Sequence, residues 1–105
     1  MESPQGTILV ADDEASVRWV LAKALEESGY TVVQAADGAD ALRRLGEGNH
    51  DLAFLDIRMP DLDGLTVLAR AREEGVTTPI IIVTAQNTMA NAIEAMKRGA
   101  YDYIT

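Results

Sequence analysis

Hydrophobic and polar positions along the chain follow two alternating patterns. Short runs rich in apolar and β-branched residues are typical of buried strands. Five such runs occur, at residues 7–11, 30–35, 51–55, 79–83 and 100–105. Between the runs, apolar residues recur three or four positions apart, which places them on one face of a helix. The four predicted helical faces carry Val17, Val20, Leu21, Ala24 and Leu25; Ala41, Leu42 and Leu45; Leu65, Leu68 and Ala71; and Ala92, Ile93 and Met96.

This alternation of strand and helix predicts a single α/β domain. Strands that are apolar at every position are covered on both faces, as the strands of a parallel sheet are. Right-handed connections then place helices on both faces, which gives a doubly wound sandwich around a five-stranded parallel sheet. The 105 residues are one domain's worth, and the sequence has no linker, repeat or low-complexity stretch. Its fourth helix is expected over residues 87–98, and ligands are expected outside the carboxyl ends of the strands.

Composition and charge exclude several classes of function. With 9 Lys and Arg against 17 Asp and Glu, the formal net charge of −8 repels nucleic-acid phosphates, so direct nucleic-acid binding is not expected. The chain has no cysteine, which excludes disulfides and thiolate metal sites. Its longest apolar run is too short to cross a membrane, and its first residues lack the basic and apolar blocks of a secretory signal. We therefore expect a cytoplasmic protein without membrane contact.

Polar residues follow three of the predicted strands directly. Asp12 and Asp13 follow the first strand, Asp56 follows the third, and Thr84 follows the fourth. Because the carboxyl ends of parallel strands meet at one edge of the sheet, we expect these four side chains to lie together. Carboxylates brought together repel one another unless a cation or protons neutralise them. An all-oxygen cluster without His or Cys suits Mg²⁺ or Mn²⁺, which bind carboxylates together with phosphate oxygens.

A purely structural role remains open for each of these acids taken singly. An aspartate after a strand is commonly the N-cap of the next helix, where its carboxylate accepts backbone N–H groups. Asp12, Asp13 and Glu14 would also be favoured by the helix dipole in the first turn of a helix. Three acids placed at strand ends in this way are harder to explain by capping alone. The pattern therefore favours a cation site.

The motifs around these residues resemble a known family. The segments VADDE (10–14), LDIRMPDLDG (55–64), IVTA (82–85) and GAYDY (99–103) are similar to the receiver domain of two-component response regulators, the CheY-like superfamily. The resemblance covers almost the whole chain. Within the superfamily, SVRWVL (16–21) and DIRMP (56–60) resemble the nitrogen-regulatory class, whose members activate sigma-54-dependent transcription. The resemblance implies a flavodoxin-like strand order 2-1-3-4-5 and a bacterial signalling module that is not a turnover enzyme.

The resemblance also implies roles for the acidic residues. Asp56 corresponds to the phosphoacceptor, which takes a phosphoryl group from the phosphohistidine of a sensor histidine kinase. Asp13 and Asp56 correspond to direct Mg²⁺ ligands, and the main-chain carbonyl of Arg58 corresponds to a third. Asp12 corresponds to a second acid that acts on the metal through water. A carboxylate is an adequate nucleophile for this transfer, and an acyl phosphate is reactive enough to serve as a reversible signal.

Two further residues correspond to the family's switch. Thr84 matches the hydroxyl that bonds the new phosphoryl oxygen, and Tyr103 matches the aromatic side chain whose rotamer follows that hydroxyl. A phosphoryl group adds about −1.5 to −2 charge and three acceptor oxygens, enough to move a nearby hydroxyl. The change is expected to reach the face formed by the fourth helix and the fifth strand, and through it an output domain, most naturally a transcriptional one.

The sequence departs from the family pattern at its C-terminal end. The family places a lysine directly after the position of Thr105, followed by a fifth helix, and neither lies within the 105 residues. Residues 1–105 are therefore expected to form a C-terminally incomplete receiver domain. Because the fifth helix would share one face of the sheet with the first, an apolar strip is expected to be exposed there. That strip would favour a homodimer or a strand-exchanged oligomer.

Three alternatives to a switchable receiver stay open at this point. A truncated receiver could be unable to accept phosphate and act only as an interaction module. A Mg²⁺-dependent phosphohydrolase of the haloacid-dehalogenase type also uses an aspartate at a strand end, but it needs a second acid two residues later, where this chain has Arg58. A flavodoxin-like binding module would need a glycine- or hydroxyl-rich phosphate loop after the first strand, where this chain has three acids.

Overall fold

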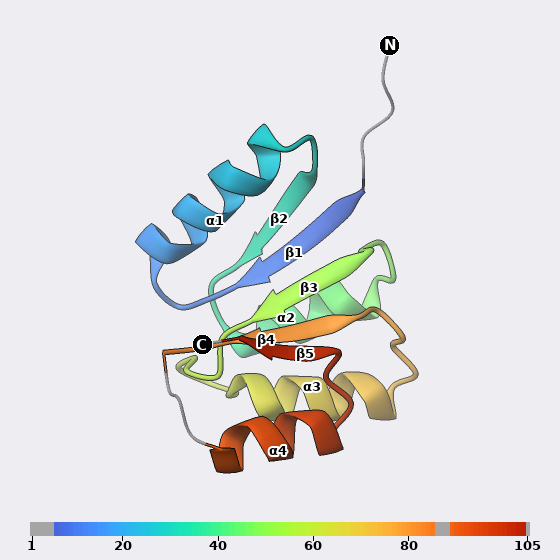
Figure 1. Cartoon of the computed structure of the whole chain (residues 1–105). Coiled ribbons are helices and arrows are strands. Elements are labelled where there is room, and N and C mark those ends of the chain that lie inside the picture. The colour runs from blue at the N-terminus through green and yellow to red at the C-terminus, as the bar shows by residue number, and fades with distance from the viewer. Residues whose placement is uncertain (1–5, 86–88, 105) are drawn as a thin grey trace.

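Strands and helices alternate along residues 6–85 and 89–104, which are the residues that the computed structural model describes (Figure 1). The strands are β1 (Thr7–Ala11), β2 (Thr31–Ala35), β3 (Leu52–Leu55), β4 (Ile80–Val83) and β5 (Asp102–Ile104). The helices are α1 (Ala15–Glu27), α2 (Gly38–Gly46), α3 (Gly64–Glu73) and α4 (Met89–Lys97). The predicted elements are all present within a few residues of their expected bounds. Residues 87 and 88 of the predicted fourth helix, and Thr105, lie outside the described residues.

The strands form one parallel sheet in the order β2-β1-β3-β4-β5, which confirms the predicted doubly wound fold. The register aligns the carboxyl ends of the three central strands. Ala11 at the end of β1 lies opposite Leu55 of β3, and Leu55 lies opposite Ile82 of β4. The residues that follow these strands therefore emerge side by side at one edge of the sheet.

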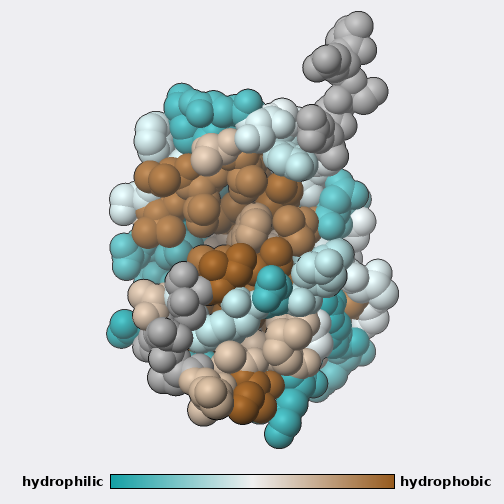
Figure 2. All heavy atoms as spheres, viewed as in Figure 1, coloured by the Kyte–Doolittle hydropathy of each residue, from teal (hydrophilic) through white to brown (hydrophobic). Residues whose placement is uncertain are grey.

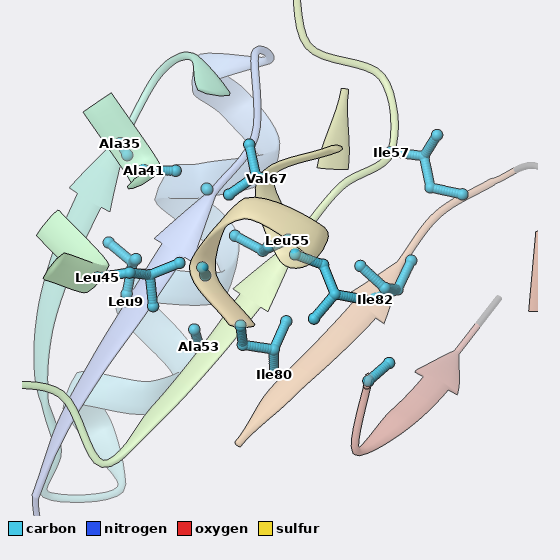
Figure 3. Packing of buried hydrophobic residues seen from close by; sticks show 14 of the residues in the cluster. Leu9, Ala35, Ala41, Leu45, Ala53, Leu55, Ile57, Val67, Ile80 and Ile82 are labelled. Carbon is cyan, nitrogen blue, oxygen red and sulfur yellow. The ribbon is translucent and has the colours of Figure 1, made fainter. Parts of the chain in front are cut away.

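A continuous hydrophobic core fills the space between the sheet and α2, α3 and α4. Every second residue of the central strands points into it, and Figure 3 shows these side chains meeting those of α2 and α3. The fully buried members with the largest side chains are Leu9, Leu45, Leu55, Leu68, Ile80, Ile82 and Val67. Each buried side chain of this size stabilises the fold by about 1.5–3 kcal/mol relative to full exposure. The strand ends therefore project from a rigid base.

The opposite face of the sheet is covered only in part by the described residues. Helix α1 packs over β1 and β2, while Phe54 of β3 and Val83 of β4 are only half-buried on that face. Figure 2 shows a continuous hydrophobic area over α1 and the neighbouring strands. Within it, a groove of about 390 Å³ is lined by Ser16, Val17, Val20, Leu21 and Val83. The predicted apolar strip is therefore present.

The apolar faces of α1 and α4 are buried only in part. In α1 the buried residue is Ala22, whereas Val20 is 60% exposed, because no described element covers the outer side of this helix. In α4 the small side chain of Ala95 faces the core, whereas Ile93 and Met96 are about half exposed. Helix α4 and the neighbouring β5 thus present a second exposed apolar surface. None of the described helices is both long and apolar enough to span a membrane.

Arg72 ties α3 to the C-terminal end of α4. Its Nε and Nη2 atoms donate hydrogen bonds to the carbonyl oxygen of Gly99, at 3.1 and 2.9 Å. Its Nη1 atom donates to the carbonyl oxygens of Val76 and Thr78, both at 2.9 Å. Carbonyl groups near helix ends lack partners within the helix, so one guanidinium group satisfies acceptors from two connections at once.

Candidate metal centre

Three carboxylates gather where the central strands end. Asp12 and Asp13 follow β1 directly, and Asp56 follows β3. One carboxylate oxygen from each of the three lies within 4.8 Å of the other two. Asp12 is only 9% exposed, Asp56 is partly buried, and Asp13 is exposed to solvent. The structure thus brings together the three acids that the sequence placed at this edge.

Backbone hydrogen bonds of the sheet continue one residue past the strands and fix these acids. The Asp56 N–H group donates to the carbonyl oxygen of Ala11 at 3.0 Å, and the Asp12 N–H group donates to that of Ala35 at 3.1 Å. The Asp12 carboxylate accepts the N–H group of Glu14 at 2.9 Å. These bonds fix the backbone of Asp12 and Asp56 and the carboxylate of Asp12, which favours a preorganised site.

The loop after Asp56 folds back tightly against it. The N–H group of Gly64 donates to the carbonyl oxygen of Ile57 at 2.9 Å, and a Cβ atom at position 64 would lie 2.2 Å from the Asp56 carbonyl oxygen. Only glycine fits this approach without displacing backbone. The backbone N–H groups of Ile57 and Arg58 lower the pKa of Asp56, so the start of this loop favours the charged form of the carboxylate.

Burial and mutual repulsion make the negative charges of this cluster costly. Burial raises the pKa of Asp56, the charge of Asp13 adds to the rise, and hydrogen bonds from the Arg58 and Ile57 backbone and the Thr84 hydroxyl oppose it. Burial also raises the pKa of Asp12, and the charges of Asp56 and Asp13 add to this rise. A divalent cation would relieve both effects. Because every donor is a hard oxygen and Asp13 opens to solvent, the donor set fits Mg²⁺.

The structure also places the remaining predicted site residues. Thr84 is 5% exposed, and its N–H group donates to the carbonyl oxygen of Ile104 at 3.0 Å, which holds it at the end of β4. Its hydroxyl lowers the pKa of Asp56, which places it near that carboxylate. Tyr103 pairs in register with Ile82, so it shares a sheet face with Thr84, and its ring packs against the core. The Arg58 side chain is exposed, which leaves its backbone as its link to the site.

Comparison with known proteins identifies the family. The model of the response regulator receiver domain matches residues 8–105. This chain belongs to the receiver-domain family. The match favours a receiver over the hydrolase and flavodoxin-like alternatives raised by the sequence.

Relatives of this receiver domain include a transcriptional regulator and solved receiver structures. The chain is 38% identical over 100 residues to the DNA-binding transcriptional regulator NtrC of Escherichia coli K12, covering 95% of this chain and 21% of NtrC. It therefore spans about a fifth of the length of that relative. The receiver domain of the Francisella response regulator 1452 superposes with a TM-score of 0.89 at 35% identity, covering 94% of this chain and 82% of that one.

A third comparison bears on the chemistry of the family. A response regulator from Burkholderia pseudomallei, solved with a phosphorylated aspartic acid, a calcium ion and citrate, superposes with a TM-score of 0.86 at 30% identity. The match covers 93% of this chain and 58% of that one. In that protein, an aspartate carries phosphate in a crystal that also holds a divalent cation. Those are the two features that the acidic cluster of this receiver domain suits.

Sequence reasoning missed two residues that support the receiver site. The Arg18 Nη1 atom donates to the carbonyl oxygen of Asp12 at 2.6 Å, and the Asp61 carboxylate bonds the start of α2. Arg18 lies six residues from Asp12, a spacing that does not match the three- or four-residue repeat of a helix, so the sequence pattern did not indicate the contact. Asp61 follows a proline and reads as an ordinary turn residue. Only the three-dimensional arrangement of the loops reveals both contacts.

Proposed function

We propose that this receiver domain accepts a phosphoryl group on the carboxylate of Asp56 and so controls an output domain. The observation that supports this most directly is the gathering of Asp12, Asp13 and Asp56 within 4.8 Å at the ends of β1 and β3. The phosphoryl donor is the phosphohistidine of a sensor histidine kinase. A cytoplasmic location follows from this pairing, because a receiver must reach the phosphohistidine of its kinase.

In the transfer, an Asp56 carboxylate oxygen attacks phosphorus. A carboxylate–phosphorus bond forms while the bond between phosphorus and the imidazole nitrogen of the kinase breaks, and that nitrogen keeps the electron pair. Asp13, Asp56 and the Arg58 carbonyl would hold Mg²⁺ directly, with Asp12 acting through water. When bound, this cation neutralises charge on the nucleophile and the incoming phosphate. The Ile57 and Arg58 N–H groups keep the carboxylate oriented, and orientation supplies much of the catalysis in phosphoryl transfer.

The response to phosphorylation would begin at Thr84. Its hydroxyl lowers the pKa of Asp56 before transfer and would bond a phosphoryl oxygen afterwards. The Tyr103 ring lies on the same sheet face and would follow the hydroxyl. The exposed apolar surface of α4 and β5 would then change its fit to an output domain. One acceptor is modified once for each signal, so the domain is a switch and not an enzyme that turns over free substrate.

The test is phosphorylation by acetyl phosphate with Mg²⁺, followed by intact-protein mass spectrometry. We expect the parent chain to gain one phosphoryl group and the Asp56→Asn variant to gain none. Asp51→Asn is the matched control, because Asp51 directly precedes β3 just as Asp56 directly follows it. Labelling of Asp56→Asn at the parent rate would refute the assignment. Absence of labelling in the parent chain under saturating Mg²⁺ would indicate a pure interaction module.

A further inference from the structure

Asp61 joins the loop after Asp56 to the N-terminal end of α2. One of its carboxylate oxygens accepts the N–H group of Gly38 at 2.8 Å, and the other accepts that of Ala39 at 2.9 Å. The first oxygen also accepts the N–H group of Leu62 at 2.7 Å. One side chain therefore bridges two segments that are separated by 23 residues in the sequence.

These bonds complete the first turn of α2. The Asp37 carboxylate accepts the N–H group of Asp40 at 2.8 Å, and the Asp37 carbonyl accepts that of Ala41 at 3.1 Å. The first N–H groups of a helix have no partner within the helix, so the remaining two need an outside acceptor. Asp61 supplies it. The negative carboxylate also interacts favourably with the positive end of the helix dipole.

A second contact between the same two segments is independent of the carboxylate. A Cβ atom at Gly38 would lie 2.3 Å from the carbonyl oxygen of Leu62 and 2.7 Å from the Leu62 Cβ atom. The glycine thus lets α2 start directly against the loop. Leu62 also packs against the hydrophobic core, which gives the loop a fixed side from which Asp61 reaches α2.

The loop held in this way is the one that shapes the acceptor site. It begins at Asp56, and the N–H groups of its next two residues, Ile57 and Arg58, lower the pKa of the Asp56 carboxyl. Its far end returns to Asp56 through Gly64. Arg58 is exposed and lies between these anchors. The direction of its backbone N–H and carbonyl groups therefore depends on how firmly the rest of the loop is held.

We propose that Asp61 is a positioning residue of the acceptor site, which fixes the loop against α2 so that the backbone of Arg58 faces Asp56 and its cation. This inference rests on the proposed function of Asp56. It adds that the start of α2, which contributes no site side chain, is part of the support of the site. A residue that orients metal-site groups in this way typically changes metal affinity about 10-fold or more when removed.

The test compares Asp61→Ala with Asp37→Ala in the 105-residue chain. Both variants remove a carboxylate acceptor from the first turn of α2, so both should lower the unfolding midpoint. Only Asp61→Ala should weaken Mg²⁺ binding, by about 10-fold in titration calorimetry, and slow phosphorylation by acetyl phosphate at subsaturating Mg²⁺. Asp37→Ala should leave the Mg²⁺ dissociation constant within about twofold of the parent value, because the Asp37 carboxylate bonds Asp40 within α2.

The asparagine variants separate the effect of lost hydrogen bonds from the effect of lost negative charge. Asp61→Asn keeps one carbonyl acceptor and should weaken Mg²⁺ binding less than Asp61→Ala, whereas a pure charge effect would make the two equal. Asp37→Asn removes the same charge from the same helix end and should leave the Mg²⁺ affinity unchanged. Equal Mg²⁺ affinities for the Asp61 and Asp37 variants, with Asp56 still phosphorylated in the parent chain, would overturn this inference alone. A parent chain that binds no Mg²⁺ would overturn the proposed function with it.

Discussion

At the scale of single residues, Asp12 and Asp56 carry charge at a cost to the fold. Both lie where water is largely excluded, and both face Asp13. Such clusters are retained because they serve a ligand, and proteins commonly give up stability at functional sites for this reason. The cost also gives the site its affinity for a cation, because binding a divalent ion removes the repulsion.

This cost predicts an unusual pH dependence in the absence of metal. The pKa values of Asp12 and Asp56 are raised in the folded chain, so the folded state takes up protons before the unfolded state as the pH falls. Their contribution to stability therefore increases from neutral pH toward the ordinary carboxyl range, and it is lost as the pH rises through the raised pKa values. Urea unfolding in EDTA at about pH 7 and pH 5 measures this effect.

The comparison with Asp56→Asn isolates the contribution of Asp56. Asp40 and Asp61 have lowered pKa values and act with the opposite sign, but they are the same in both proteins. We expect Asp56→Asn to be more stable than the parent chain by about 1 kcal/mol at neutral pH without metal, and the difference to shrink in acid. Equal stability of the two proteins at neutral pH would contradict this prediction.

At the scale of elements, polar contacts between connections decide how the helices are held. Arg72 is the clearest case, since its guanidinium group binds three carbonyl oxygens, those of Val76, Thr78 and Gly99. The last of these follows α4, the helix that is expected to respond to phosphorylation. The C-terminal end of α4 is thereby fixed to α3, so any rearrangement of α4 is expected to be largest at its other end.

Replacement of Arg72 tests this anchor. Arg72→Met keeps much of the aliphatic packing but removes every one of these hydrogen bonds, and we expect the free energy of unfolding to fall by about 2 kcal/mol. Arg72→Lys should recover only part of the loss, because an ammonium group cannot reach carbonyls on two connections at once. The exposed Arg70 on the same helix provides the control. Equal stability of Arg72→Met and Arg70→Met in urea unfolding would show that the anchor contributes nothing.

The sequence predicts the order of the elements and the meeting of the three acids, but it does not predict burial outside a helix or contacts between loops and helices. Strand and helix order, and the meeting of Asp12, Asp13 and Asp56, followed from local periodicity and from the rule that parallel strands share one carboxyl edge. The helical pattern placed Val20 on an apolar face but could not give its exposure, because burial depends on what packs outside the helix and not on the helix itself. The contacts of Asp61 also escaped, since nothing in a linear sequence shows that a turn carboxylate will reach a helix 22 or 23 residues away.

At the scale of the whole molecule, the sheet is covered unequally. Helices α2, α3 and α4 cover one face, whereas the face beside α1 exposes the apolar groove that includes Val17, Val20 and Val83. Continuous apolar areas of this kind favour association in water. The 105-residue chain is therefore expected to bind a second copy of itself through this face.

Sedimentation velocity over a range of concentrations tests this expectation. The parent chain should show a concentration-dependent increase in sedimentation coefficient, and Val20→Asp should remain monomeric at the same concentrations. Ile93→Asp, on the exposed apolar surface of α4, is the matched control and should still associate. A monomer at every concentration would contradict the prediction. If Ile93→Asp were monomeric while Val20→Asp still associated, the interface would lie on α4.

The attachment of the site to three adjacent central strands has a consequence for newly synthesised copies. Asp12 and Thr84 are 72 positions apart along the chain, with Asp56 between them, and the three meet only when β1, β3 and β4 are paired in register. An incomplete polypeptide still on the ribosome can contain Asp56 before β4 and Thr84 have been made. If Asp56 is the acceptor, as proposed, such an immature copy is expected to be phosphorylated poorly, because its site is not yet assembled.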